Sequence, residues 1–410
     1  MRRIITFLLL YVSFTAVSGQ TGWFIPSNRF SSSQITDICQ DRYGYIWIAT
    51  EYGLNRFDGY RFTTYLNQPG DTTSLCCNAV SRLFCDDEGS LWVGTAKGLD
   101  RYDYGRNMFR HYRFANGVKP RVNVISSLRD GRLFVGTAGY GAHLVESGDS
   151  LADVSKRYTV PEEDAFFSRV YEDSRGRVWK GGFGNVFTLR ETNGKIRKFV
   201  SPFGSPIGFT EYEGEVLIVC MRGILSFSIG GGKSVRVSDI DMSVMSDKRI
   251  PILTVYKDKS GNIYIGTRGN GLFRLSNGSR RFERIESVTE GIDLNTAKIW
   301  AVTQDRDGNI WVGCQSKGLF VLPCRQPRFR NWSFSAQKVS IGSTITSICE
   351  GDNGIMWCTV QGNGVFGFDG NGRIVARPQS PSSTEFIFRD SRRRYWLGTD
   401  NGFYVYDPVT

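Results

Sequence analysis

Nine copies of one short pattern constrain this chain more than any other feature. Each copy has a large apolar residue in the middle of a strand-like segment: Trp47, Trp92, Phe134, Trp179, Leu217, Tyr264, Trp311, Trp357 and Trp396. The intervals between these positions run from 38 to 47 residues. A period in this range, with about four strands per unit, is typical of a β-propeller blade.

Residues 35–62 show the pattern most clearly. Residues 35–39, 45–50 and 54–57 are predicted to be strands because they alternate in polarity or are rich in β-branched and aromatic residues. Residues 61–65 would complete a four-stranded antiparallel sheet. Such a sheet cannot bury both of its faces alone, so each copy needs neighbours.

The turn before the apolar residue reads Asp-x-x-Gly-x-x-aromatic in five copies, which begin at Asp41, Asp86, Asp173, Asp258 and Asp305. Asp binds its own turn and Gly accepts a positive φ. We expect the Asp to fasten the turn and the aromatic residue to pack between blades. These shared residues are therefore interpreted as scaffold.

The predicted fold is all-β. The pattern is interrupted at residues 322–327, after its seventh copy, and residues 23–25 resemble an outer strand that pairs with the last blade and closes a ring. We therefore predict a seven-bladed propeller of four-stranded blades over residues 20–330. Residues 331–410, with a similar outer strand at 328–332, would begin a second, incomplete propeller of two blades. A single nine-bladed ring is the alternative.

Residues 1–19 have the organisation of a signal peptide. Arg2 and Arg3 precede a short apolar stretch, and small residues at 16–19 would allow cleavage. We predict export, with an uncleaved anchor as the alternative. No later segment is long and apolar enough to cross a membrane, so no membrane span is expected in the mature chain.

The net charge of +11 favours anionic partners. Nucleic acid is not expected, because the sequence has no nucleic-acid-binding motif. The nine cysteines are odd in number and irregularly spaced. Cys39, Cys220, Cys314 and Cys349 stand at strand positions and are interpreted as packing residues, whereas a bridge from Cys76 or Cys77 remains open.

The repeat resembles a known family. Residues 39–58 and 84–103 follow I-x-x-D-x-x-G-x-[IL]-W-[IV]-[GA]-T-x-x-G-L-x-R-[FY]-D, which is similar to the two-component regulator propeller repeat. The resemblance covers residues 23–407. It implies the periplasmic sensor region of a hybrid histidine kinase of Bacteroidetes, in which further propeller, membrane, kinase, receiver and DNA-binding parts follow. Under this resemblance the chain is a fragment or a truncated sensor, and the rest of a sensor kinase is an expected partner.

Motifs for catalysis, cofactors and metals were sought without result. His111 and His143 are isolated, and neither lies in a phosphoacceptor context, so neither kinase activity nor a His-based metal site is expected. The sequence has no Gly-x-Ser-x-Gly elbow and no Walker loop, and we predict no cofactor. A pair of carboxylates in a central cleft remains open.

The predicted ligand site is formed by the turns between the second and third strands, which should share one face and surround the central channel. Their variable residues include aromatic and basic side chains, which suit sugar rings and anionic groups. The candidate ligand-binding residues are Tyr52, Lys97, Tyr140, Phe183, Arg222, Arg268, Asn270 and Lys317.

We therefore predict a non-catalytic periplasmic sensing module. By the family resemblance, its ligand is an oligosaccharide, and the basic turns favour an anionic one. The alternatives are a propeller lyase or glycosidase that acts on an anionic polysaccharide, or a scaffold that binds another protein. A homodimer is also left open.

Overall fold

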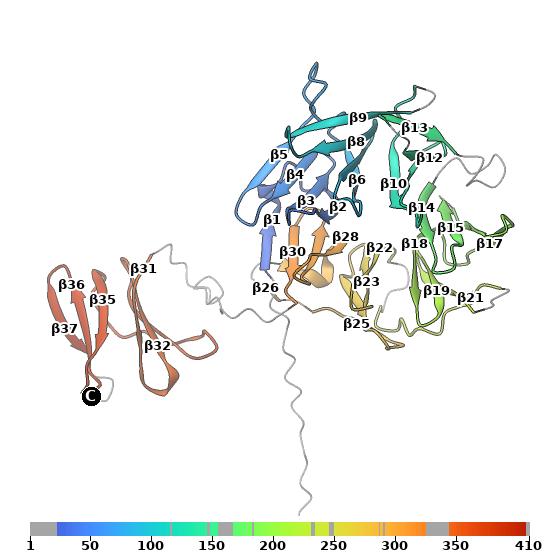
Figure 1. The fold of residues 1–410 in the computed structure, drawn as a ribbon. Coiled ribbons are helices and arrows are strands. Elements are labelled where there is room, and N and C mark those ends of the chain that lie inside the picture. The colour runs from blue at the N-terminus through green and yellow to red at the C-terminus, as the bar shows by residue number, and fades with distance from the viewer. Residues whose placement is uncertain are drawn as a thin grey trace, which may run out of the picture. The chain divides into compact units, whose positions relative to one another are not determined.

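The computed structural model describes residues 23–406 apart from 115–116, 146–147, 155–166, 183, 231–233, 246–249, 287, 290–291 and 325–343. The chain divides into two compact units, Met1–Gln326 and Pro327–Thr410 (Figure 1). The predicted signal peptide and the predicted strand at 328–332 lie outside the described residues. None of the helices in the described part is long and apolar enough to span a membrane.

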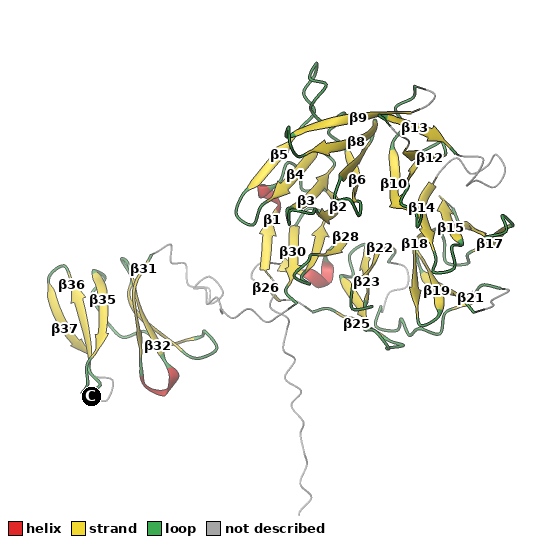
Figure 2. Cartoon of the chain, viewed as in Figure 1, coloured by secondary structure: helices red, strands yellow, loops and turns green. Residues whose placement is uncertain are grey.

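Strands and the turns between them make up nearly all of the first unit (Figure 2). Its strands form four-stranded antiparallel groups, which we number in chain order. Group 1 contains β2 (Ile35–Gln40), β3 (Ile46–Thr50), β4 (Gly53–Phe57) and β5 (Phe62–Tyr65). Group 2 contains β6 (Val80–Cys85), β7 (Leu91–Thr95), β8 (Gly98–Asp103) and β9 (Met108–Phe114). Group 3 contains β10 (Val122–Ser127), β11 (Leu133–Thr137), β12 (Ala142–Val145) and β13 (Ser150–Asp153), and β13 pairs in parallel with β9.

The next two groups have the same strand order. Group 4 contains β14 (Phe167–Glu172), β15 (Val178–Gly182), β16 (Val186–Arg190) and β17 (Ile196–Val200). Group 5 contains β18 (Pro206–Tyr212), β19 (Glu215–Cys220), β20 (Gly223–Ser228) and β21 (Arg236–Val237).

Group 6 contains β22 (Ile252–Lys257), β23 (Ile263–Thr267), β24 (Leu272–Leu275) and β25 (Phe282–Arg284). A small hairpin of β26 (Val288–Thr289) and β27 (Ile292–Asp293) follows it. Group 7 contains β28 (Ile299–Gln304), β29 (Ile310–Cys314), β30 (Gly318–Leu322) and, as its fourth strand, β1 (Trp23–Pro26). Two 3-10 turns, η1 (Ser27–Arg29) and η2 (Leu294–Thr296), lie in the connections.

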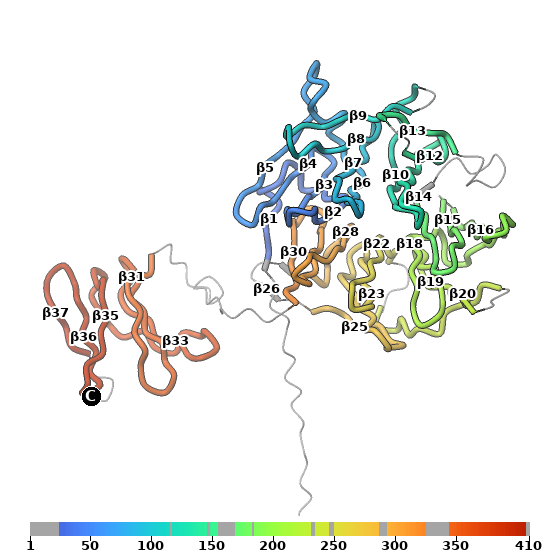
Figure 3. The backbone as a smooth tube through the Cα atoms, in the orientation of Figure 1, coloured from blue at the N-terminus to red at the C-terminus, as the bar shows by residue number. Residues whose placement is uncertain are grey.

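The first unit closes on itself. The first strands contact one another in the sequence β2, β6, β10, β14, β18, β22 and β28, and β28 contacts β2 again. The N-terminal β1 lies beside β30 from the end of the unit (Figure 3), with Phe24 opposite Phe320 and Ile25 opposite Leu319. This pairing confirms the prediction that residues 23–25 join the last strands of the ring.

The second unit contains two further groups. One has β31 (Ile345–Glu350), β32 (Met356–Val360), β33 (Gly364–Phe368) and β34 (Ile374–Ala376), with η4 (Asp352–Gly354) in its first turn. The other has β35 (Thr384–Arg389), β36 (Tyr395–Thr399) and β37 (Gly402–Tyr406).

The core lies between neighbouring groups, as the repeats predicted. Trp47 of β3, for example, is fully buried in a cluster with Leu83 and Val93 of group 2. The Asp turns are also confirmed. Asp41 Oδ1 accepts the backbone N–H groups of Tyr43 and Tyr45, at 2.9 and 3.0 Å.

Candidate functional site: a central cavity

A cavity of about 820 Å³ lies where the first strands of the groups meet. All of the groups 1 to 7 contribute residues to its lining. The volume lies within the usual range for pockets that bind small molecules. Since the strands around it are joined into a ring, the cavity is a preformed feature of the fold.

A β-bulge near the start of each first strand shapes the wall. The strand pairing shifts register at this point, so one residue of each first strand has no partner on the second strand. Bulges of this kind re-aim a side chain and are frequent beside functional sites. The bulged residues that line the cavity are Thr36, Ser81, Asn123, Ile207, Leu253 and Trp300. Residue 168 holds the same backbone position in β14, and its side chain lies outside the described part of the chain.

Two arginines of the wall, Arg82 and Arg169, make hydrogen bonds to the backbone of the neighbouring groups. Arg82 Nε donates to the backbone oxygen of Asn123 at 2.9 Å, and Arg169 Nε donates to the backbone oxygen of Ile207. Desolvation, together with repulsion from Arg82, lowers the pKa of Arg169 to about 9. The two guanidinium groups therefore repel each other in a poorly solvated space.

Asp37 on β2 is the acid beside these arginines. Its Oδ2 accepts the backbone N–H of Leu83 at 3.0 Å. Desolvation raises the pKa of the Asp37 carboxyl, and Arg82 partly opposes this rise. The Asp37 carboxyl thus interacts electrostatically with both Arg82 and Arg169, and guanidinium groups are a common means of binding anions.

The rim of the cavity adds polar and aromatic groups. Trp300 is 39% exposed, and its Nε1 donates to Gln315 Oε1 at 3.3 Å. Gln315 Nε2 in turn lies 3.4 Å from Gln34 Oε1. Arg121 and Glu51 are exposed at the same rim. An aromatic face beside amides and a guanidinium group can bind a ligand that carries both hydroxyl and anionic groups.

A second cavity of about 500 Å³ lies between groups 5 and 6. Its apolar wall includes Phe203, Met242 and Met245, and Met221 lines both this cavity and the central one. Two of the predicted ligand-binding residues, Arg222 and Asn270, line it. Asn270 Oδ1 accepts a hydrogen bond from Arg284 Nη2 at 2.8 Å.

The other predicted residues that the structure describes lie on turns outside both linings. Tyr52 and Tyr140 are 57% and 47% exposed, and Lys97 and Arg268 are also exposed. Lys317 Nζ donates to the backbone oxygen of Asp293 at 3.0 Å, so its charge points toward the connection between groups 6 and 7. Phe183 is outside the described residues. The turns do border the central cavity, but through Glu51, Ala138, Met221 and Gln315, each of which immediately follows the second strand.

Sequence reasoning missed the bulged residues that line the central cavity. A signal was available, since the second residue of each first strand varies from Thr36 to Trp300 while the residue before it is nearly always apolar. Arg82 and Arg169 each follow a bulged position by one residue, and they were also missed because the sequence analysis considered only the turns as ligand-binding elements.

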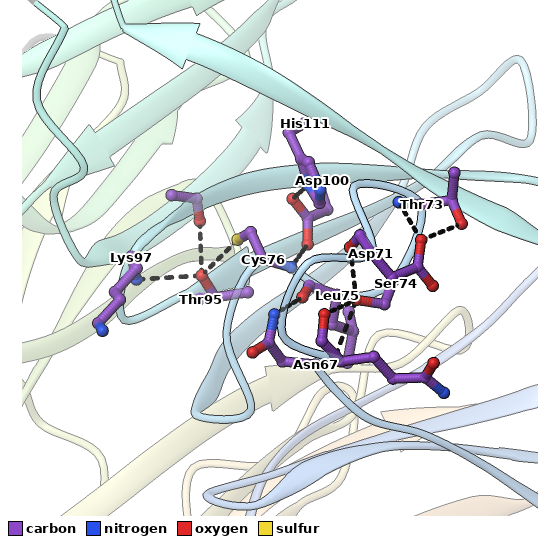
Figure 4. A network of polar contacts seen from close by, with 12 residues as sticks. Asn67, Asp71, Thr73, Ser74, Leu75, Cys76, Thr95, Lys97, Asp100 and His111 are labelled. Carbon is purple, nitrogen blue, oxygen red and sulfur yellow. Dashed lines mark hydrogen bonds and ion pairs between the residues drawn. The ribbon is translucent and has the colours of Figure 1, made fainter.

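A compact polar cluster in group 2 could also hold a metal ion. Ligand atoms of Cys76, Asp100 and His111 all lie within 4.8 Å of one another. Asp100 lies between the other two (Figure 4): it accepts the Cys76 backbone N–H at 2.9 Å, and His111 Nδ1 lies 2.7 Å from its Oδ1. The Lys97 side chain points away from this cluster (Figure 4). Thiolate, carboxylate and imidazole are all ligands for zinc.

Group 1 repeats this cluster with residues that are poor zinc ligands. Ser31, Asn55 and Thr64 correspond to Cys76, Asp100 and His111: the Ser31 N–H donates to Asn55 Oδ1 at 3.1 Å, and the Thr64 hydroxyl donates to the same oxygen at 2.9 Å. Burial raises the pKa of the Cys76 thiol, so it keeps its proton, with Thr95 Oγ1 at 3.1 Å from its sulfur. The arrangement is therefore explained as a structural contact, in which hydrogen bonds attach the segment before β6 to strands β8 and β9 of group 2.

Comparison with known proteins connects the repeats to signalling. The family described as two component regulator propeller matches residues 29–52, 74–97 and 293–316. Over 82 residues the chain is 40% identical to histidine kinase P4 of Formosa agariphila, which corresponds to 18% of this chain and 6% of that protein.

Solved structures share the propeller fold. The extracellular domain of a hybrid two component system from B. thetaiotaomicron has a TM-score of 0.63 at 23% identity, over 95% of this chain and 54% of that domain. Virginiamycin B lyase from Staphylococcus aureus has a TM-score of 0.58 at 14% identity, over 74% of this chain and 99% of the enzyme. At these identities the likeness concerns the fold alone. The chain spans about half of the solved extracellular domain and a small part of the histidine kinase.

Proposed function

We propose that this chain, which carries the repeats of the two-component regulator propeller family, is the ligand-sensing part of a two-component sensor. In this proposal groups 1 to 7 are the blades of a complete propeller, residues 331–410 begin a second one, and the chain is exported to the periplasm after loss of residues 1–19. The ligand is an anionic oligosaccharide bound in the central cavity. The observation that carries the proposal is the preformed cavity with Arg82 and Arg169 in its wall.

The lining suits a saccharide in particular. Asn123, Thr36 and Gln315 supply donors and acceptors for hydroxyl groups, while Trp300 offers a partly exposed aromatic face on which a sugar ring can stack. A carboxylate or sulfate on the sugar would offset the excess of guanidinium groups over Asp37.

Sensing is favoured over turnover by the composition of the wall. Among the described residues that line the cavity, Glu51 is the one acid, since Asp37 is not part of the lining, and neither His nor Tyr occurs. Glycoside hydrolysis by the usual mechanism needs two carboxyl groups about 5–9.5 Å apart. The likeness to virginiamycin B lyase supplies no catalytic residue at this level of identity. A lyase or glycosidase therefore remains the alternative that the experiment must test.

The test uses residues 20–410 with a panel of uronic-acid-containing, sulfated and neutral oligosaccharides. Binding is measured by calorimetry and thermal shift, and product release by chromatography. We expect saturable binding of an anionic member with no new product. Release of a new product would favour the lyase or glycosidase over the sensing module. Absence of binding across the whole panel would reject an oligosaccharide as the ligand.

Two sets of variants distinguish the cavity from the turns. Arg121→Gln with Trp300→Ala alters two exposed residues of the cavity rim, and we expect binding to weaken at least about tenfold, equivalent to about 1.4 kcal/mol. The matched control is Lys97→Ala with Arg222→Ala and Arg268→Ala, outside the central lining, which should change affinity less than about twofold. The reverse result would place the ligand on the turns, as the sequence first indicated.

A further inference from the structure

We propose that Cys39 and Cys85 form a disulfide that fastens group 1 to group 2 when the chain folds in the presence of a disulfide oxidant. Cys39 lies on β2 and Cys85 is the last residue of β6. Their sulfur atoms are 3.4 Å apart. A disulfide requires about 2.05 Å, so small rotations of the two side chains bring the sulfurs to bonding distance.

Hydrogen bonds hold the two strands at the separation that the bridge needs. Thr36 Oγ1 donates to the backbone oxygen of Val80 at 2.7 Å, and the Leu83 N–H donates to Asp37 Oδ2 at 3.0 Å. Side chains two residues apart on a strand share a face. Cys39 therefore lies on the same face of β2 as Asp37, which contacts β6. Cys85 likewise lies on the same face of β6 as Leu83.

The other junctions of the ring show that packing does not demand cysteine here. The pairing register places Cys39 opposite Trp47 and Cys85 opposite Leu91, which defines the equivalent positions elsewhere. The equivalent pairs are Phe84 with Ser127, Ser126 with Glu172, Tyr171 with Glu211, Thr210 with Lys257, Tyr256 with Gln304, and Thr303 with Gln40. Large, small and charged residues all occur at these positions, yet one junction has cysteine on both sides.

The chemistry is a thiol–disulfide exchange in two steps. One thiol loses its proton and attacks a disulfide of the oxidant, forming a mixed disulfide and releasing one thiol. The second cysteine thiolate then attacks the mixed disulfide and releases the other. Two electrons and two protons pass to the oxidant, which leaves as a dithiol or as two thiols.

The environment indicates when this happens. Cys39 and Cys85 are both only partly accessible in the folded chain. The hydrogen bond with Cys85, together with burial, raises the pKa of the Cys39 thiol, which slows its exchange at neutral pH. We therefore expect the bridge to form during folding, before the strands close over the sulfurs.

The test is a peptide map of the chain refolded with oxidised glutathione. Trypsin releases residues 30–42 and 83–97, each of which contains one cysteine. We expect these peptides linked under non-reducing conditions and separate after reduction. Recovery of both as free thiols from folded, oxidised protein would overturn the proposal.

A stability measurement on variants gives an independent reading. The oxidised chain should melt about 5 °C above the reduced chain, because the bridge restricts the unfolded state. Cys39→Ser should abolish this difference, and Cys76→Ser, a matched control in the same two groups, should retain it. A difference that persists in Cys39→Ser would assign the effect to another pair.

Discussion

In the repeats that carry the Asp turn, a single carboxylate joins several parts of the structure. In group 1, Asp41 Oδ1 holds the turn, whereas Asp41 Oδ2 accepts the indole N–H of Trp47 at 2.7 Å and the hydroxyl of Tyr104 from group 2 at 2.9 Å. The indole contact recurs between Asp86 and Trp92. One side chain thus orients the aromatic residue that fills the core between groups.

The two histidines should respond to pH in opposite directions. The hydrogen bond to Asp100 raises the pKa of His111, whereas burial lowers the pKa of His143. The His111 contribution to stability is fully present below the unfolded pKa of about 6.5, and it is lost as the pH rises through the raised folded value. The His143 environment instead weakens folding as the pH falls below about 6.5, because the folded chain resists protonation there.

Replacement by Gln isolates each effect. The loss of unfolding free energy caused by His111→Gln should be larger at pH 5.5 than at pH 8, and the loss caused by His143→Gln should be smaller at pH 5.5 than at pH 8. Denaturant unfolding at the two pH values measures both. Losses that do not change with pH would show that neither imidazole titrates differently in the folded chain.

At the scale of elements, closure of the ring depends on how β1 seats against β30. Gly318 begins β30 with φ of +123°, and a Cβ there would collide with the backbone oxygen of Ile25 and lie 2.8 Å from the Ser27 nitrogen. Gly194 has φ of +84° with open space around it. The two glycines share the positive φ, but only Gly318 abuts another strand.

Alanine substitutions should therefore differ in cost. Gly194→Ala introduces backbone strain and should lower the unfolding free energy by about 1 kcal/mol. Gly318→Ala also requires β1 to move away from the new Cβ. It should therefore lower the unfolding free energy by at least about 2 kcal/mol more than Gly194→Ala does. Urea unfolding of both variants gives the comparison, and equal costs would show that β1 is not seated as described.

Strands that repeat a local sequence pattern could be predicted from the sequence. Features that depend on the register between paired strands could not. The strands around Trp47 and the closing strand at residues 23–25 follow from polarity and spacing. Variation at the second position of each first strand was a signal, but the bulge at Thr36 itself depends on the register of β2 against β3, which no local pattern encodes. The cavity wall, including Arg82 and Arg169, therefore appeared only when the strands were placed.

At the scale of the whole molecule, the repeats specify a ring because each group covers the exposed face of the next. The sequence placed an interruption at residues 322–327, where the repeat pattern is broken although the spacing from Trp311 to Trp357 is not. It predicted a central channel but not the residues that line it, because the lining depends on side chains from every group at once. The proposed binding depends on that convergence, because residues far apart in the chain, such as Thr36 and Trp300, line one space.

The division into two units predicts that binding belongs to the first alone. Every residue that lines the central cavity lies between Gln34 and Gln315, within the unit that ends at Gln326. A chain of residues 20–326 should therefore keep the β1–β30 closure and bind the anionic oligosaccharide with an affinity within about twofold of that of residues 20–410. Calorimetry on the two chains, with circular dichroism to verify folding, makes the comparison. A folded short chain that has lost binding would show that residues 327–410 complete the site, and the cavity proposal would then have to include them.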